Sequence, residues 1–142
     1  MMFKTHLVFG ILLALLSIKL FSVEKEVLFF VLIVFASVIP DIDISNSKVG
    51  SKVKPLSWII NLLFGHRGIF HGVLLPLVVF FIFLFFNQKE LGTAFFIGYI
   101  GHLILDSLSY VGVKFFIPLS KFKVSGFIKS GSVLDYALMF IL

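Results

Sequence analysis

Residues 91–110 read LGTAFFIGYIGHLILDSLSY, an apolar stretch in which His102 is the only histidine and Asp106 is among the few charged residues of the whole chain. A transmembrane helix needs about 20 predominantly apolar residues to cross a hydrocarbon core of about 30 Å. Other apolar runs cover residues 5–22, 27–40 and 68–86, and a further run begins near Val133. The sequence therefore predicts an all-α membrane protein with four to five transmembrane helices in a small bundle, folded as a single domain over residues 1–142.

The composition excludes a water-soluble fold of this size. Hydrophobic residues make up 60% of the chain and charged residues 13%, with 20 phenylalanines among 142 residues, which is far from the usage of soluble globular proteins. The absence of cysteine excludes thiolate metal sites and cysteine nucleophiles. The net charge of +5 could indicate nucleic acid, but the basic residues are scattered through loops between the apolar runs. We therefore expect no nucleic-acid partner and attribute the charge to membrane topology.

The basic residues also predict the orientation of the chain. If the N-terminus lies on a membrane face called side A, the successive crossings bring residues 41–67 and 111–132 to side A as well. Most of the twelve basic residues then lie on side A, namely Lys4, Lys48, Lys52, Lys54, Arg67, Lys114, Lys121, Lys123 and Lys129. The positive-inside rule makes side A cytoplasmic, and we expect a multi-pass protein of the inner membrane.

The histidines and aspartates gather near the same face. Side A receives His6, Asp41, Asp43, His66, His71, His102, Asp106 and Asp135, whereas the three glutamates fall in the short turns of the opposite face. Polar residues often collect at helix ends, but His102 and Asp106 lie inside an apolar run, where ionisable groups are expensive and usually functional. Their i, i+4 spacing places them on one helix face. They could therefore bind a common ion, or form a hydrogen bond that only fixes helix packing.

Imidazoles and carboxylates without thiolates suit zinc, manganese or iron. Eight candidate ligands exceed the needs of one ion, and two neighbouring metals can stabilise both the attacking and the leaving oxygen of a phosphoester displacement. We therefore expect an intramembrane site near side A with divalent metal ions, two in number, and zinc as the favoured metal.

Arg67 is the only arginine of the chain and stands between His66 and Gly68. The planar guanidinium suits phosphate oxygens. Two interpretations remain open, a substrate-binding residue and a boundary residue that binds lipid headgroups.

Several short motifs follow one another in a characteristic order. They are Thr5-His6, Pro40-Asp41-Ile42-Asp43, His66-Arg67-Gly68-Ile69-Phe70-His71, Gly98-Tyr99-Ile100-Gly101-His102-Leu103-Ile104-Leu105-Asp106, Gly112-Val113 before Pro118, and Ser130-Gly131-Ser132 before Asp135. In this combination the chain resembles the family of predicted membrane-bound metal-dependent hydrolases, whose bacterial members include a LexA-regulated inner-membrane protein. The resemblance covers nearly the whole chain.

The resemblance implies metal-dependent hydrolysis at the membrane, with metal ligands at His6, Asp41, His66, His71, His102 and Asp106. At the position of Asp135 we expect this family to carry glutamate more often, and the shorter aspartate is a further candidate ligand. The ligand set is also loosely similar to that of the zinc-dependent phospholipases C, which suggests a phosphoester substrate.

The sequence therefore predicts a hydrolase that cleaves a lipid-borne ester, with a phosphoester favoured, and membrane lipids as both environment and substrate. Metal-bound water would be the nucleophile. Asp41 or Asp43 could accept its proton, with Asp43 preferred, and Arg67 could hold the phosphate. Two alternatives remain, a metal-binding membrane transporter and a structural membrane protein without catalysis. A transporter needs a polar route to the opposite face, and a structural role predicts that no metal is bound.

Overall fold

The computed structural model describes residues 1–43, 69–120 and 122–142. These residues form five α-helices: α1 (Phe3–Leu20), α2 (Glu26–Ala36), α4 (Leu74–Phe85), α5 (Lys89–Ser107) and α6 (Val133–Ile141). There are also two short 3-10 helices: η1 (Ile39–Asp43) follows α2, and η3 (Ile69–His71) precedes α4. Each apolar run expected from the sequence carries a helix, which confirms the all-α prediction for the described residues.

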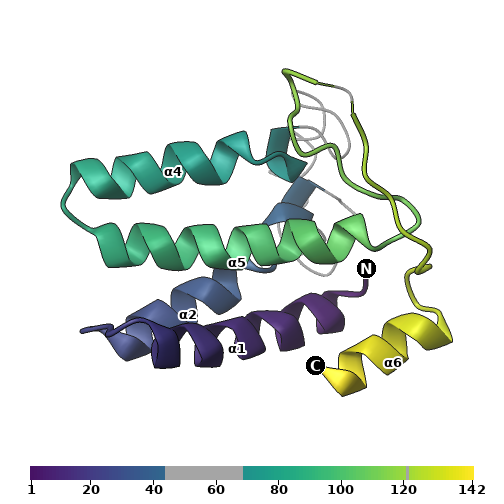
Figure 1. Ribbon diagram of the computed structural model, residues 1–142, viewed down its shortest axis with the longest axis horizontal. Coiled ribbons are helices and arrows are strands. Elements are labelled where there is room, and N and C mark those ends of the chain that lie inside the picture. The colour runs from purple at the N-terminus through teal and green to yellow at the C-terminus, as the bar shows by residue number, and fades with distance from the viewer. Residues whose placement is uncertain (44–68, 121) are drawn as a thin grey trace.

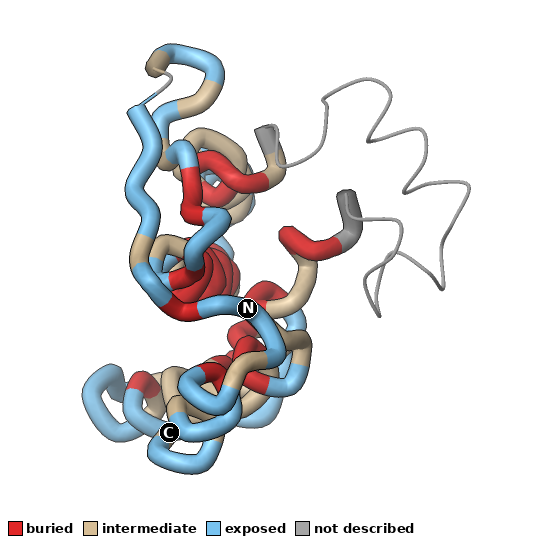
Figure 2. Tube along the Cα trace, turned by 90° about the vertical axis from the view of Figure 1, so that its right-hand side faces the viewer, coloured by how far each residue is buried: buried red, intermediate tan, exposed pale blue. Residues whose placement is uncertain are grey.

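Helix α5 is the centre of the bundle. It contacts α1, α2 and α4, and Figure 1 shows α4 and α5 side by side with α1 and α2 below them. Buried side chains of α5 contribute to two hydrophobic clusters, one around Tyr99 and Leu103 and one around Ala94. Figure 2 shows the buried residues gathered between the elements, with exposed residues on the outside. This packing buries most residues of the carboxyl-terminal half of α5.

A glycine allows α2 and α5 to approach closely. A Cβ atom at Gly98 would collide with the carbonyl oxygen of Ile33 and would also press on Ala36. Small residues at such positions let helix backbones pack directly against each other. The close approach brings the ends of α2 and α5 together one helical turn further along, where the candidate site lies.

Two helices are shorter than their apolar runs suggest. Helix α2 ends at Ala36, and Pro40 lies in the 3-10 helix that follows. Helix α4 begins at Leu74 rather than at Gly68, and Pro76 occupies its first turn. Proline is tolerated there because the first N–H groups of a helix have no intrahelical partner. In both cases an aspartate or histidine of the site falls on a 3-10 turn instead of a regular helix.

Among the described residues, α1 is the one helix that is both long and apolar enough to cross a membrane, and α4 is a shorter apolar helix. Large apolar side chains such as Val78, Phe81 and Phe85 are nevertheless exposed along α4. Multi-pass insertion therefore stays a prediction at this point, although the outer surface of the bundle is strongly apolar.

The described residues between α5 and α6 contain no helix. Residues 108–130, called here the 108–130 ribbon, double back through isolated bridges between Ser109 and Ile128 and between Val113 and Val124. In Figure 1 the ribbon crosses the right-hand ends of the helices before the chain enters α6, which contacts α1.

Candidate metal centre

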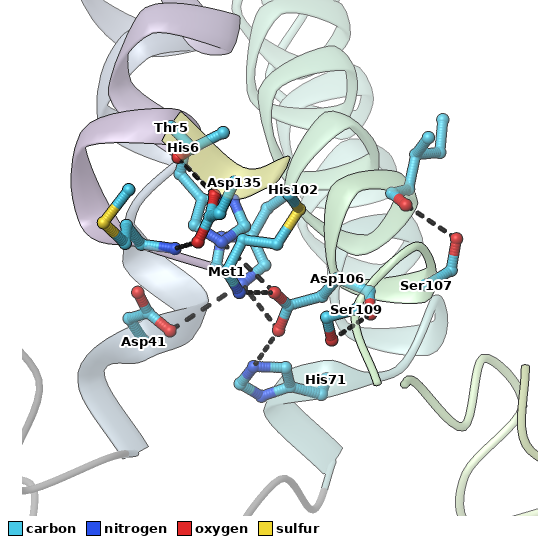
Figure 3. Close-up of polar contacts among 12 residues, drawn as sticks. Met1, Thr5, His6, Asp41, His71, His102, Asp106, Ser107, Ser109 and Asp135 are labelled. Atoms are coloured by element: carbon cyan, nitrogen blue, oxygen red, sulfur yellow. Dashed lines mark hydrogen bonds and ion pairs between the residues drawn. The ribbon is translucent and has the colours of Figure 1, made fainter. Parts of the chain in front are cut away.

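Five ionisable side chains converge at one end of the bundle. Helix α1 supplies His6, η1 supplies Asp41, η3 supplies His71, and α5 supplies His102 and Asp106. All five are buried, and Figure 3 shows them directed toward one another. His6 and Asp106, 100 positions apart in the chain, therefore meet because the close packing of α1, α2 and α5 aligns their ends.

The carboxylate of Asp106 lies between the histidines. Its Oδ1 atom is 3.2 Å from Nε2 of His6, while its Oδ2 atom is 3.7 Å from Nε2 of His71 and 3.8 Å from Nε2 of His102. The Oδ1 atom also lies 2.6 Å from the amino group of Met1. The two oxygens of this one carboxylate thus face different partners.

The hydrogen bond of His102 determines which of its ring nitrogens faces the cluster as an acceptor. Nδ1 lies 2.8 Å from the carbonyl oxygen of Ser37, and because a carbonyl can only accept, Nδ1 must carry the proton. In the neutral imidazole Nε2 then has a lone pair. This atom is buried and has no hydrogen-bond partner among the described residues. It lies 3.9 Å from Oδ1 of Asp41 and 3.8 Å from Oδ2 of Asp106.

A lone pair facing two carboxylates is unfavourable without a cation between them, and the observed distances suit one. Ligands bound at about 2.0–2.2 Å in a tetrahedral site lie about 3.4 Å apart. Metal-binding histidines almost always donate their other ring N–H to a carbonyl or carboxylate. Two groups of potential ligand atoms each lie within 4.8 Å of one another, namely His6, His102 and Asp106, and Asp41, His71 and His102. These residues could therefore hold divalent metal.

Burial makes the charged form of Asp41 costly, a cost that a bound cation would offset. Burial raises the pKa of this carboxyl above its ordinary value, and the neighbouring charge of His6 opposes that effect. A metal ion would favour the charged carboxylate at this position.

Asp135 lies outside both groups. Its Oδ1 atom accepts a hydrogen bond from Oγ1 of Thr5 at 2.7 Å, and its Oδ2 atom accepts from the backbone N–H groups of Met2 and Gly131 at 3.0 and 2.9 Å. These bonds account for the complete burial of Asp135 and join α6 to the first turn of α1 (Figure 3). The structure thus gives Asp135 a position beside His6, and its role as a metal ligand stays a prediction.

Three predicted site residues cannot be placed. His66 and Arg67, as well as the side chain of Asp43, lie outside the described residues. Conversely, sequence reasoning did not find Ser37, whose contribution to the site is a backbone carbonyl. A backbone group carries no signal in the side-chain pattern, so only the packing of α2 on α5 reveals it.

Known proteins give the same indication as the motifs. The chain is 35% identical over 98 residues to the uncharacterized protein YvsG of Bacillus subtilis (strain 168), a match that covers 68% of this chain and 61% of that relative. The chain therefore matches about three fifths of the length of this relative. No solved structure matches it. The family model described as YdjM inner membrane protein matches residues 1–142. The resemblance to predicted membrane-bound metal-dependent hydrolases is thereby confirmed, and the chain belongs to the YdjM inner membrane protein family.

Proposed function

We propose that this protein is a membrane-bound hydrolase that uses two divalent metal ions to cleave a lipid-borne ester, with a phosphoester as the favoured substrate class. The observation that carries the proposal is the buried Nε2 atom of His102, which faces Asp41 and Asp106 without a hydrogen-bond partner among the described residues. Membership of the YdjM family supports both the membrane location and the metal-dependent chemistry.

The positions of the two carboxylate oxygens of Asp106 favour a division of the candidate ligands between two ions. A neutral His102 with its proton on Nδ1 has one lone pair and can bind a single ion. Asp106 has two oxygens that face different histidines, so it is the better candidate for a bridge. His6 and Asp106 would hold one ion, and Asp41, His71 and His102 would hold the other together with Asp106.

Divalent ions at such a site supply Lewis acidity and lower the pKa of bound water toward neutrality. Side chains of the protein would accept the proton and bind the phosphate. Asp41 or Asp43 would accept a proton from the attacking water, with Asp43 preferred because Asp41 lies within the ligand group. Arg67 would hold the phosphate through its bidentate fork. Helix packing around the site would limit access of bulk water.

The membrane arrangement forms part of the same proposal. We place α1, α2, α4 and α5 as crossings of the inner membrane, with the metal centre opening to the cytoplasmic leaflet. Insertion in the membrane is supported by the exposed apolar side chains of α4 and by the family description. The orientation is supported by the bias of basic residues toward one face. Membrane lipids would then supply both the environment and the substrate.

Product analysis tests the proposal. The full chain is reconstituted in phospholipid vesicles and either loaded with zinc or stripped with a chelator. Metal-dependent release of phosphorylated headgroup or of phosphate is expected from phosphoester cleavage, whereas release of fatty acid would assign a carboxylic ester. A preparation with two bound metal ions that cleaves neither class of ester would contradict the proposed function.

A further inference from the structure

Backbone hydrogen bonds hold the described residues of the 108–130 ribbon together. The backbone groups of Val113 and Val124 exchange two hydrogen bonds of 2.8 and 2.9 Å, and the N–H of Tyr110 donates to the carbonyl of Ile128 at 2.8 Å. The ribbon is also joined to α4, because the N–H of Val73 donates to the carbonyl of Phe115 at 2.8 Å. The direction of its side chains is therefore set by the fold.

The two faces of the ribbon differ in character. Ser109, Val113 and Ile128 are buried against the bundle. The outward side chains include five large apolar or aromatic residues that are each more than half exposed, namely Tyr110, Phe116, Leu119, Phe122 and Phe127. Exposed apolar surface of this kind marks an interaction site.

The positive charge of the ribbon indicates a negatively charged partner. Lys114, Lys123 and Lys129 are exposed, and the sequence contains no aspartate or glutamate between Ser107 and Leu134. Apolar side chains interleaved with lysines match the boundary between acyl chains and anionic headgroups of a bilayer. A surface without any acidic residue is thus complementary to anionic lipid.

The position of the ribbon agrees with such a partner. It passes the ends of α1, α4 and α5 on one side of the bundle (Figure 1). If these helices cross a membrane, the ribbon lies at the membrane surface. A hollow of about 490 Å³ opens there, lined by Ser109, Tyr110, Val111, Lys129 and Ser130. The hydroxyl of Ser109 donates to the carbonyl of Asp106 at 2.7 Å, so the hollow adjoins the end of α5 that carries the metal centre.

We propose that the 108–130 ribbon is an interfacial lipid-binding element, with its aromatic and aliphatic side chains inserted at the acyl boundary and its lysines bound to anionic headgroups. The inference rests on the proposed membrane placement of the bundle, and it requires neither bound metal nor hydrolysis.

Fluorescent labels test the insertion. The chain has no cysteine, so single cysteines at Phe122 and Phe127 can carry an environment-sensitive label in reconstituted full-length protein. We expect severalfold stronger quenching by lipids with spin-labelled acyl chains than by aqueous iodide. A label at Phe81, which is exposed on α4, serves as the control for insertion of the bundle, and one at Asn87 reports the turn at the other end of α4 and α5.

The outcomes separate the two proposals. A quenched label at Phe81 with ribbon labels that only iodide reaches would overturn the ribbon proposal while leaving membrane insertion intact. Energy transfer between fluorescent ribbon labels on two chains would overturn it in favour of a second copy. A label at Phe81 that lipids do not quench would overturn the membrane placement, and the ribbon proposal with it.

Lysine variants test the headgroup contact. One lysine near an anionic surface strengthens binding about fivefold. We therefore expect spin-labelled phosphatidylglycerol to quench the Phe127 label severalfold more than spin-labelled phosphatidylcholine, and this preference to disappear in K114Q/K123Q/K129Q. The control K25Q/K89Q changes lysines of the opposite turns and should keep the preference. An unchanged preference in the triple variant would overturn the assignment of the lysines.

Discussion

The Nδ1 atom of His102 lies 2.8 Å from the carbonyl oxygen of Ser37, across the contact between α5 and α2. Because the carbonyl is an acceptor, this contact holds the proton on Nδ1 and leaves Nε2 to the two carboxylates of the site. The same hydrogen bond fixes the plane of the ring. The backbone of α2 thus orients a candidate ligand histidine on α5.

Alanine variants should lose metal in a pattern that reveals how the ligands are shared. If Asp106 bridges two ions, His6→Ala should leave about one ion per chain, and so should His71→Ala or His102→Ala, whereas Asp106→Ala should leave none. Elemental analysis of protein purified in detergent measures this directly. Equal metal content in the parent and in His102→Ala would instead return His102 to a role in helix packing.

Substitution of Asp135 separates a ligand from a structural anchor. Asp135→Ala leaves three donors without their acceptor, and each buried unsatisfied group costs about 1–3 kcal/mol, so thermal unfolding in detergent should shift downward. Asp135→Asn keeps most of these hydrogen bonds and should retain both metal ions. Loss of an ion in Asp135→Asn with little change in unfolding temperature would establish Asp135 as a ligand.

The sequence predicts the described helices well because each one overlaps an expected apolar run, although α2 and α4 are shorter than their runs. It also predicts that His102 and Asp106 act together, since their spacing alone puts them on one helix face. Which other side chains join them depends on the register between helices. Gly98 sets that register through its contact with Ile33, and no periodicity of a single segment reveals such a contact.

The 108–130 ribbon and Asp135 show where sequence reasoning stops. The segment contains lysines and turn residues typical of a water-exposed loop, yet pairing of Val113 with Val124 turns a row of aromatic side chains outward. Asp135 looks like the other aspartates near the same face, but its acceptors are used by Thr5 and two backbone N–H groups. Long-range pairing decides both cases.

Cysteine labelling in intact cells should reveal the orientation of the site. A single cysteine at Gln88, in the turn between α4 and α5, should react with an impermeant thiol reagent, whereas one at Ser125 in the ribbon should be protected. This pattern follows from the excess of basic residues on side A. Permeabilised cells provide the control, because the cysteine at Ser125 should react there. The reverse pattern would place the metal centre at the outer leaflet.

Arg67→Lys distinguishes a phosphoester from other esters. Lysine keeps the positive charge but loses the bidentate fork, so metal content should persist while turnover of a phospholipid falls. Loss of one charge-assisted contact costs about 1.5–3 kcal/mol, or roughly ten- to a hundredfold in rate if the contact is made in the transition state. Equal turnover by the metal-loaded variant and parent would exclude this role of Arg67 and weaken the phosphoester assignment.

Gly98→Ala tests whether helix packing controls the metal centre from a distance. The added methyl group would meet the carbonyl of Ile33, and backbone cannot move aside as a flexible side chain can, so α2 and α5 must separate locally. Overpacking of this kind costs about 1–3 kcal/mol. His102 lies four residues after Gly98, and Ser37 lies four residues after Ile33, so the two contacts are one helical turn apart. A local separation at Gly98 and Ile33 would therefore break the contact between His102 and Ser37.

We therefore expect Gly98→Ala to weaken metal binding although it changes no ligand, measured as a higher zinc dissociation constant in competition with a chelator. Gly92→Ala is the matched control on α5, since its methyl group would meet Cβ of Phe83 and both Cδ2 and the carbonyl oxygen of Phe80 on α4, at 3.0–3.2 Å. These contacts are looser than the one with Ile33 and lie far from the site, so the zinc affinity of this variant should equal that of the parent. If both variants bind zinc as tightly as the parent, the contact between His102 and Ser37 does not depend on the approach of the two helices, and the metal centre must be organised by the ligands themselves.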